Sequence, residues 1–303
     1  MKRSVKITLI VAASLVGLGL CLSAVGFLMG GRLSDLRNMR FDPATGQWEQ
    51  HSTPEPTETP YTGSSYTLPE GTEITTLNID WITGDVTVRV TDNEVVTVEE
   101  SIGRSGGIAH PMTVASDNGT LQIRYAEREF LGLTDLPEKE LTVCLPRTVA
   151  EHLTEVRFNS VSADFETDAL TVGSSFLFDS TSGDLKTGRI TADGADAELN
   201  TVSGEIQLDG SFRQVTGGST SGEYELTLRR CPEKIDLSTV SGKVELELPR
   251  SAAFTLRYST VSGELESDFT MKRDGKRYIC GDGGGCEITV STTSGDLKAE
   301  PID

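Results

Sequence analysis

Apolar and polar residues repeat in the second half of the chain in units of about twenty residues. Each unit centres on a Ser-Gly pair that an acidic residue usually follows, and successive centres lie 18 to 21 residues apart, except for a last gap of 32. Mostly apolar side chains stand seven and five positions before the centre and two after it, and Ser or Thr stands three before it. The centres are Gly183, Gly204, Gly222, Gly242, Gly263 and Gly295, with Ala163 as a weaker first copy.

This spacing predicts two short strands that meet at each glycine. The side chains seven, five and three positions before the centre share one face of a strand, because side chains alternate with period two. After the glycine, the first apolar side chain stands two positions further on. The alternation of apolar and polar side chains therefore shifts by one residue at the glycine. Glycine reaches positive φ at little cost, so we expect a bend or bulge at each of these corners.

A single unit buries too little apolar surface to offset the ordering of twenty residues, so the units must stack. The sequence therefore predicts an all-β fold, a right-handed β-helix or β-solenoid-like head of coils of ~20 residues. We place this domain at residues 72–303, with an insertion at 264–287. Residues 77–90 match the repeat imperfectly around Gly84, and the residues between this unit and Ala163 are interpreted as irregular early coils. A β-sandwich of hairpins is the alternative.

The N-terminal part has a different pattern. Residues 7–31 carry no charge and are rich in Leu, Val, Ile and Ala, so they predict one transmembrane helix. Lys2, Arg3 and Lys6 precede it, which places the short end 1–6 in the cytoplasm and the bulk of the chain outside the cell membrane. A cleaved signal peptide is the rival interpretation. Residues 32–71 are expected to form a linker rich in Pro, Thr and Glu.

The formal net charge is −19, which disfavours a nucleic-acid partner and attracts cationic peptides or divalent cations. If the coils stack, the residues after the glycines form one outward file, interrupted by Lys243. This file is a candidate acidic binding stripe for a cationic peptide, and less readily for Ca²⁺; no other cofactor is expected. The competing interpretation is ordinary turn chemistry and solubility. The candidate residues are Asp184, Glu205, Glu223, Glu264 and Asp296.

The remaining chemistry is sparse. Cys280 and Cys286 flank a GDGGG segment that could form a hairpin, so a disulfide between them is plausible outside the cell. The acidic residues recur once per coil, as a structural repeat requires, whereas an active site would gather unique residues. One unique segment, residues 127–140, is interpreted as a solvated loop. We therefore expect no catalytic residues and no zinc site.

The repeat resembles a known family. The Ser-Gly-Asp/Glu units, the LPR segment at 145–147 and the GDG at 281–283 before ITVSTTSGDL are similar to the β-strand-repeat "putative adhesin" family of bacterial envelope proteins, a domain of unknown function. The resemblance spans about residues 72–300. It implies a β-helix-like fold and extracytoplasmic placement, and some members are implicated in sensing envelope stress or antimicrobial peptides. It supplies no catalytic residues.

Together these observations favour a non-enzymatic binding or interaction module of the bacterial envelope, with a role in envelope-stress sensing. Its expected partners are the membrane, a cationic peptide or another membrane protein, since the cytoplasmic end is too short to signal by itself. A structural or adhesive surface rod is the alternative, and a carbohydrate-active β-helix enzyme is a further one.

Overall fold

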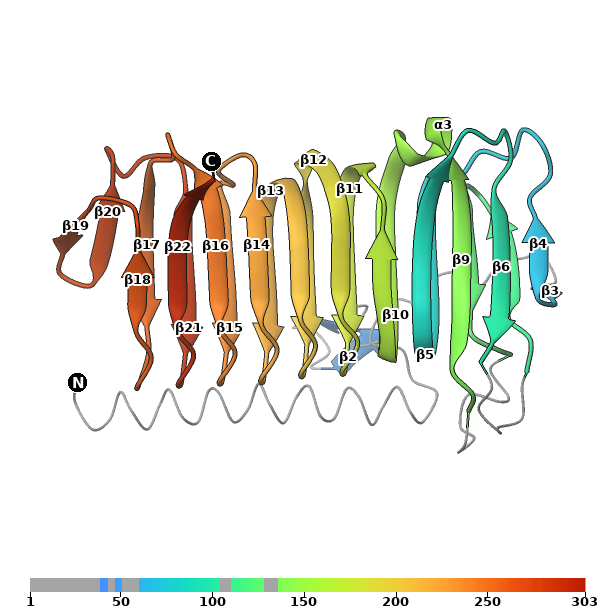
Figure 1. Cartoon of the computed structure of the whole chain (residues 1–303), viewed down its shortest axis with the longest axis horizontal. Coiled ribbons are helices and arrows are strands. Elements are labelled where there is room, and N and C mark those ends of the chain that lie inside the picture. The colour runs from blue at the N-terminus through green and yellow to red at the C-terminus, as the bar shows by residue number, and fades with distance from the viewer. Residues whose placement is uncertain (1–38, 43–46, 51–59, 104–109, 128–135, 303) are drawn as a thin grey trace.

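The computed structural model describes residues 39–42, 47–50, 60–103, 110–127 and 136–302 (Figure 1). The expected transmembrane segment, residues 7–31, lies outside these ranges. Within them, no helix has the length and apolar character that crossing a membrane requires.

Strands make up most of the described chain. A separate antiparallel pair, β1 (Met39–Asp42) and β2 (Gln47–Gln50), lies within the expected linker. The other twenty strands form one continuous sheet, which begins at Tyr61, also inside the expected linker. The strands before the repeat are β3 (Tyr61–Thr62), β4 (Ser65–Thr67), β5 (Thr76–Thr91), β6 (Thr97–Ile102), β7 (Thr113–Asp117), β8 (Thr120–Arg124) and β9 (Lys139–Pro146).

A four-residue helix, α3 (Arg147–Ala150), leads into the repeat. The strands of the repeat are β10 (Leu153–Thr167), β11 (Leu170–Ser180), β12 (Leu185–Thr201), β13 (Ile206–Ser219), β14 (Tyr224–Leu228), β15 (Lys234–Thr239), β16 (Val244–Pro249), β17 (Phe254–Ser259), β18 (Leu265–Ser267), β19 (Met271–Asp274), β20 (Arg277–Cys280), β21 (Glu287–Thr292) and β22 (Leu297–Ile302).

The repeat forms the expected solenoid. Each coil contributes one strand before its corner and one after it, and both pair in parallel with the next coil, as β13–β15 and β14–β16 do. The coils stand side by side along the long axis of the molecule, with their corners along one edge (Figure 1). We name each coil by its corner residue. The prediction of an all-β solenoid is confirmed.

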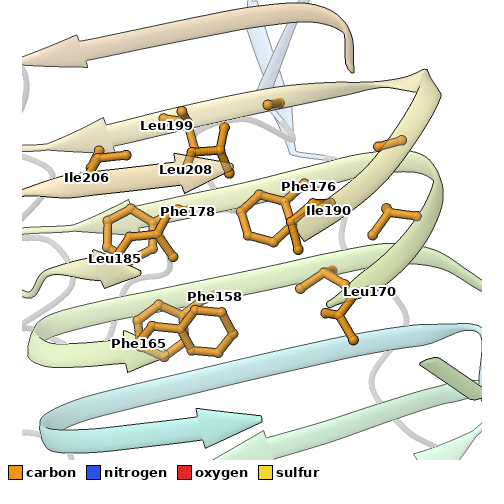
Figure 2. Packing of buried hydrophobic residues seen from close by; sticks show 14 of the residues in the cluster. Phe158, Phe165, Leu170, Phe176, Phe178, Leu185, Ile190, Leu199, Ile206 and Leu208 are labelled. Carbon is orange, nitrogen blue, oxygen red and sulfur yellow. The ribbon is translucent and has the colours of Figure 1, made fainter. Parts of the chain in front are cut away.

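The core lies between the two strands of each coil. Residues seven and five positions before the corner are buried in most coils, and they meet the buried residue two positions after it. Phe158 stacks on Phe165 across the coil at 4.4 Å between ring centroids and on Phe178 of the next coil at 5.6 Å (Figure 2). The apolar files of the sequence are thus continuous ladders along the solenoid, and these ladders stabilise stacking.

A buried hydroxyl closes each corner. At five of the six glycines, the Ser or Thr three positions earlier accepts a hydrogen bond from the glycine N–H, at 2.9 Å for Thr201 with Gly204 and 2.9 Å for Thr239 with Gly242. At Gly295, Thr292 instead donates to the glycine carbonyl oxygen at 2.8 Å. Ser160 also bonds the hydroxyl of Ser180 in the next coil at 2.8 Å. Buried polar groups need such partners, so the corner satisfies its own amide while keeping the hydroxyl inside the core.

The glycines are needed for a reason that differs from the expected one. None of the six repeat glycines has positive φ; only Gly84 among the corners does, at 102°. Instead, the carbonyl oxygen of the neighbouring corner lies against each glycine. A β-carbon on any of the six would come within 1.8 to 2.3 Å of that oxygen. Close approach between coils, and not backbone conformation, therefore excludes a side chain there.

The coils do not stack in chain order at the C-terminal end. The last coil, β21–β22, lies between the Gly242 coil and the Gly263 coil, since β21 pairs with both β15 and β17, and β22 with both β16 and β18. The expected insertion, residues 264–287, forms β18 and the β19–β20 hairpin. There β20 runs antiparallel to β17 and covers the end of the solenoid (Figure 1).

At the N-terminal end, the strands are also stacked out of chain order. Strand β5 lies between β10 on one side and β8 and β9 on the other, all in parallel, although β6 to β9 follow it in the chain. Antiparallel strands β3, β4, β6 and β7 then close this end. Both ends therefore finish in antiparallel strands, which protects the parallel ladders from adding further chains.

The corner contact yields a direct test. Replacing Gly242 by Ala places a methyl group 1.8 Å from the carbonyl oxygen of Gly222, so the coils must separate. We expect the free energy of unfolding to fall by about 2–4 kcal/mol, measured by urea denaturation. Gly194→Ala is the control, because its added methyl group meets nothing within 4 Å. Equal effects of the two substitutions would contradict this explanation of the corner glycines.

Candidate functional site

One file of mostly acidic side chains follows the corners along the outside of the solenoid. Its members are the residues directly after each corner, and the ladder hydrogen bonds give their order in space. We call this file the acidic row. From the N-terminal end it consists of Glu140, Asp85, Asp164, Asp184, Glu205, Glu223, Lys243, Asp296 and Glu264.

The aspartates of the row have a structural role. The Asp164 carboxylate accepts a hydrogen bond from the backbone N–H of Asp184 at 2.9 Å, and Asp184 accepts one from Glu205 at 2.7 Å. The carboxylate of Asp296 binds the N–H of Glu264 in the same way at 2.8 Å. Each of these side chains connects its coil to the next one, which explains part of the repeated acid after Ser-Gly as turn chemistry.

The N-terminal end of the row borders an open groove with a volume of about 480 Å³. It lies over β9, β5, β10 and the start of β12, so four neighbouring coils supply its side chains. Its polar lining residues are Asp85, Thr87, Glu140, Thr142, Asp164, Glu166, Asp184 and Lys186. Five of these eight are carboxylates and one is a lysine, so the groove favours a cation.

The charges in the groove act on one another. Partial burial raises the pKa of Asp85, and the neighbouring carboxylates of Asp164, Glu140 and Glu138 raise it further. Further along, burial and the charges of Glu205, Glu245 and Glu223 raise the pKa of Glu225, against the hydrogen bond from Gln207. Cations that approach this face would relieve repulsion already present in the fold.

The five candidate residues are distributed along the row. Asp184 lines the groove, and Glu205 and Glu223 follow it without lining the cavity. Lys243, which pairs with Glu245, separates these three from Asp296 and Glu264 at the far end. Asp296 therefore lies between Lys243 and Glu264, an order that differs from the chain order.

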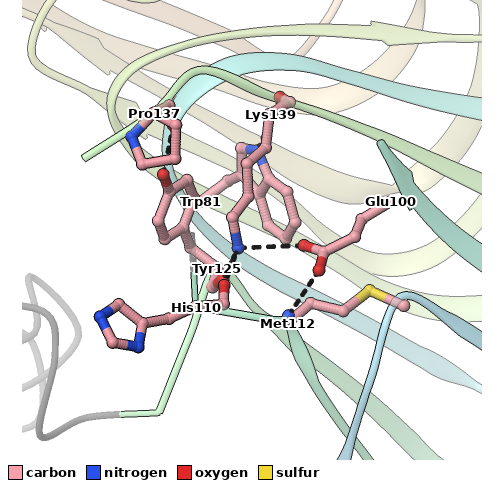
Figure 3. A network of polar contacts seen from close by, with 7 residues as sticks. All are labelled: Trp81, Glu100, His110, Met112, Tyr125, Pro137 and Lys139. Atoms are coloured by element: carbon pink, nitrogen blue, oxygen red, sulfur yellow. Dashed lines mark hydrogen bonds and ion pairs between the residues drawn. The ribbon is translucent and has the colours of Figure 1, made fainter. Parts of the chain in front are cut away.

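A buried cation lies beneath the groove. The Lys139 side chain is fully buried, and its ammonium group donates to Glu100 at 3.0 Å, to the Tyr125 carbonyl oxygen at 2.6 Å and to the His110 carbonyl oxygen (Figure 3). The second carboxylate oxygen of Glu100 accepts the N–H of Met112 at 2.9 Å. All three protons of the ammonium group thus have acceptors.

Aromatic rings surround the same ammonium group. It lies 4.1 Å from the ring centroid of Tyr125 and 5.7 Å from that of Trp81, whose indole N–H donates to the Lys139 carbonyl oxygen at 3.3 Å. Burial lowers the pKa of Lys139, while the charge of Glu100 acts in the opposite direction. Since Glu140 follows directly, this network fixes the strand that forms one wall of the groove.

This network corrects one interpretation of the sequence. Residues 127–140 were expected to be a solvated loop. Residues 128–135 lie outside the described ranges, but Lys139 is among the most buried side chains. The groove residues Glu140 and Thr142 were also missed, because β9 lacks the Ser-Gly signature. The alternation in KELTVCLP was a usable signal for a strand, but not for its pairing with β5.

The described residues hold no group of three or more His, Cys, Asp or Glu side chains arranged to bind a metal ion. The Ca²⁺ expectation therefore gains no support from geometry. All four cysteines in the described ranges are free thiols, so the pairing of Cys280 with Cys286 stays a prediction.

A family profile matches most of this solenoid. The profile of Toastrack DUF4097 aligns with residues 74–217 and again with 211–300, which together cover the strands from β5 to β21 and most of β22. The chain belongs to the Toastrack DUF4097 family. The resemblance to the "putative adhesin" proteins of unknown function is thereby confirmed.

Several solved structures are similar to this chain at low identity. A "putative adhesin" from Parabacteroides distasonis has 12% identity and a TM-score of 0.41 over 79% of this chain and 96% of its own. A "putative adhesin" from Bacteroides fragilis has 13% identity and a TM-score of 0.39 over 80% and 98%. A "putative lipid binding protein" from Parabacteroides distasonis has 15% identity and a TM-score of 0.37 over 80% and 98%. No curated protein matches the sequence.

The raised pKa of Asp85 predicts a pH-dependent stability difference. Its ionised form is disfavoured in the fold, so the wild type loses stability as pH rises from the unfolded pKa through the folded one. We expect Asp85→Asn to raise the thermal unfolding midpoint at pH 7 and to leave it unchanged at about pH 3. Thermal melts at both pH values measure this. A difference that does not vary with pH would contradict it.

The buried pair predicts strong coupling. Lys139→Met leaves the Glu100 carboxylate buried without its cation, so we expect the free energy of unfolding to fall by about 3–5 kcal/mol. The double variant Lys139→Met/Glu100→Gln should recover most of that loss, because no buried charge remains. Urea denaturation of both variants tests this, and purely additive effects would exclude the coupling.

Proposed function

We propose that this chain is a non-enzymatic binding module of the bacterial envelope, held at the membrane by residues 7–31, whose groove binds a cationic peptide segment. The observation that carries the proposal is the convergence of Glu140, Asp85, Asp164 and Asp184 from four coils on one groove. Their mutual repulsion favours binding of a partner that carries several positive charges.

The shape of the site also suits an extended ligand. The acidic row continues past the groove through Glu205 and Glu223, which belong to the next two coils. Neighbouring parallel strands lie about 4.8 Å apart, so positive side chains spaced along a peptide could meet successive carboxylates. Lys243 interrupts the row after Glu223, which would set a boundary for a cationic ligand.

Such a module suits envelope-stress sensing. In this proposal the bound state would be transmitted across the membrane through another membrane protein. A structural or adhesive rod is the second candidate, and the use of Asp164, Asp184 and Asp296 to connect adjacent coils favours it. Binding measurements separate the two.

The test is calorimetric titration of the full-length protein, in an uncharged detergent, with a soluble lysine-rich peptide at low and high salt. We expect saturable binding that Asp85→Asn/Asp164→Asn weakens roughly 2–20-fold, and that high salt suppresses. The control Glu264→Gln/Asp296→Asn removes the same charge beyond Lys243 and also retains its inter-coil acceptor. It should bind like the wild type.

Two outcomes would overturn the proposal. Equal weakening by both double variants would mean that the whole acidic face attracts the peptide and that the groove has no special part. Absence of binding at low salt would leave the structural rod as the better account.

A further inference from the structure

Three cysteines that are distant in the sequence meet near the C-terminal end of the solenoid. Cys231 lies in the turn after β14, Cys280 ends β20, and Cys286 directly precedes β21. The thiol of Cys231 lies next to that of Cys286, close enough for the two groups to interact. Cys280 instead bonds the carbonyl oxygen of Ala252 at 3.4 Å. Cys286 and Cys280 are buried, and Cys231 is partly exposed.

The inserted coil causes this meeting. Strand β21 enters between β15 and β17, and the N–H of Glu287 bonds the carbonyl oxygen of Glu233 at 3.0 Å. On its other side, the Cys286 carbonyl oxygen accepts the N–H of Thr255 at 2.9 Å. Hydrogen bonds thus hold the backbone at Cys286 on both sides. In the register of β15 and β21, Cys286 lies opposite Glu233, which is two residues after Cys231 in the chain.

We propose that Cys231 and Cys286 form a disulfide that locks the last coil, β21–β22, between the Gly242 and Gly263 coils. The bond would close a loop that contains β15 to β20, the part of the chain that the last coil must pass. It would therefore fix the order of the coils covalently. This pairing replaces the one expected from the GDGGG spacing, because Cys286 contacts Cys231.

The two thiols are suited to the two successive steps of thiol–disulfide exchange that would form the bond. The interaction with Cys286 lowers the pKa of Cys231, against its burial, and the same interaction together with burial raises the pKa of Cys286. The partly exposed Cys231 therefore reacts first. Its thiolate attacks a small disulfide R–S–S–R, forms Cys231–S–S–R and releases one R–S⁻.

The second step closes the bond. Cys286 loses its proton to the released thiolate or to solvent, and its sulfur attacks the Sγ of Cys231. The S–S bond of the mixed disulfide breaks, and the second R–S⁻ leaves. Two protein thiols are oxidised to one disulfide, and the disulfide oxidant is reduced to two thiols. Oxidants of this class belong to compartments outside the cytoplasm.

Peptide mapping tests the connectivity. The full-length protein is reduced, desalted, treated with oxidised glutathione at about pH 8, alkylated and digested with trypsin without reduction. Residues 231–234 form one tryptic peptide with Cys231, and residues 278–298 form another with both other cysteines. We expect a cross-link between these two peptides, with Cys280 alkylated. A bond within 278–298 would overturn the proposal.

Thermal melts test the lock. Oxidation should raise the unfolding midpoint of the wild type by roughly 5–15 °C. Cys280→Ser should show the same shift, whereas Cys231→Ser and Cys286→Ser should show none. A shift that survives in Cys231→Ser, or disappears in Cys280→Ser, would assign the bond to another pair. Failure of the folded wild type to oxidise, with full alkylation of Cys231, would exclude the lock altogether.

Discussion

The structure depends on one contact, the approach of a corner carbonyl oxygen to the α-carbon of the glycine in the adjacent coil. A β-carbon would overlap that oxygen at every corner glycine of the repeat. The contact sets the distance between coils at the corner, where the buried Ser or Thr hydroxyl bonds the glycine N–H. With the corners aligned, the strands on both sides pair in register and the apolar ladders become continuous.

The order of the coils then determines what the surface can do. Because β5 lies between β9 and β10, Glu140 joins Asp85 and Asp164 at the groove, and the buried pair of Lys139 and Glu100 supports that wall. At the other end, the insertion of the last coil places Asp296 beside Lys243 and brings Cys286 to Cys231. The groove and the thiol pair are thus consequences of how each end of the solenoid is closed.

The sequence was sufficient to predict the coil but not the stacking order. Period-two apolar positions around Ser-Gly identify the two strands of each coil, and they place residues such as Phe158 and Phe178 in one ladder. Every coil presents nearly the same edge, so no local feature of the repeat determines which coil stacks on the Gly242 coil. Residues whose role depends on that choice, among them Glu140, Lys139 and Cys231, could not be placed from the sequence. The corner glycines were identified, but for the wrong reason, since the clash is with another coil.

Cross-strand nuclear Overhauser contacts in the isotope-labelled full-length protein test the stacking order most directly. The account predicts contacts from Val244 to the Asp296–Leu297 backbone and from Leu297 to the Glu264–Leu265 backbone, because the ladder runs through the Gly242, Gly295 and Gly263 coils in that order. Contacts between Val244 and the Glu264–Leu265 backbone, with Leu297 at the outer edge, would show stacking in chain order and contradict the account.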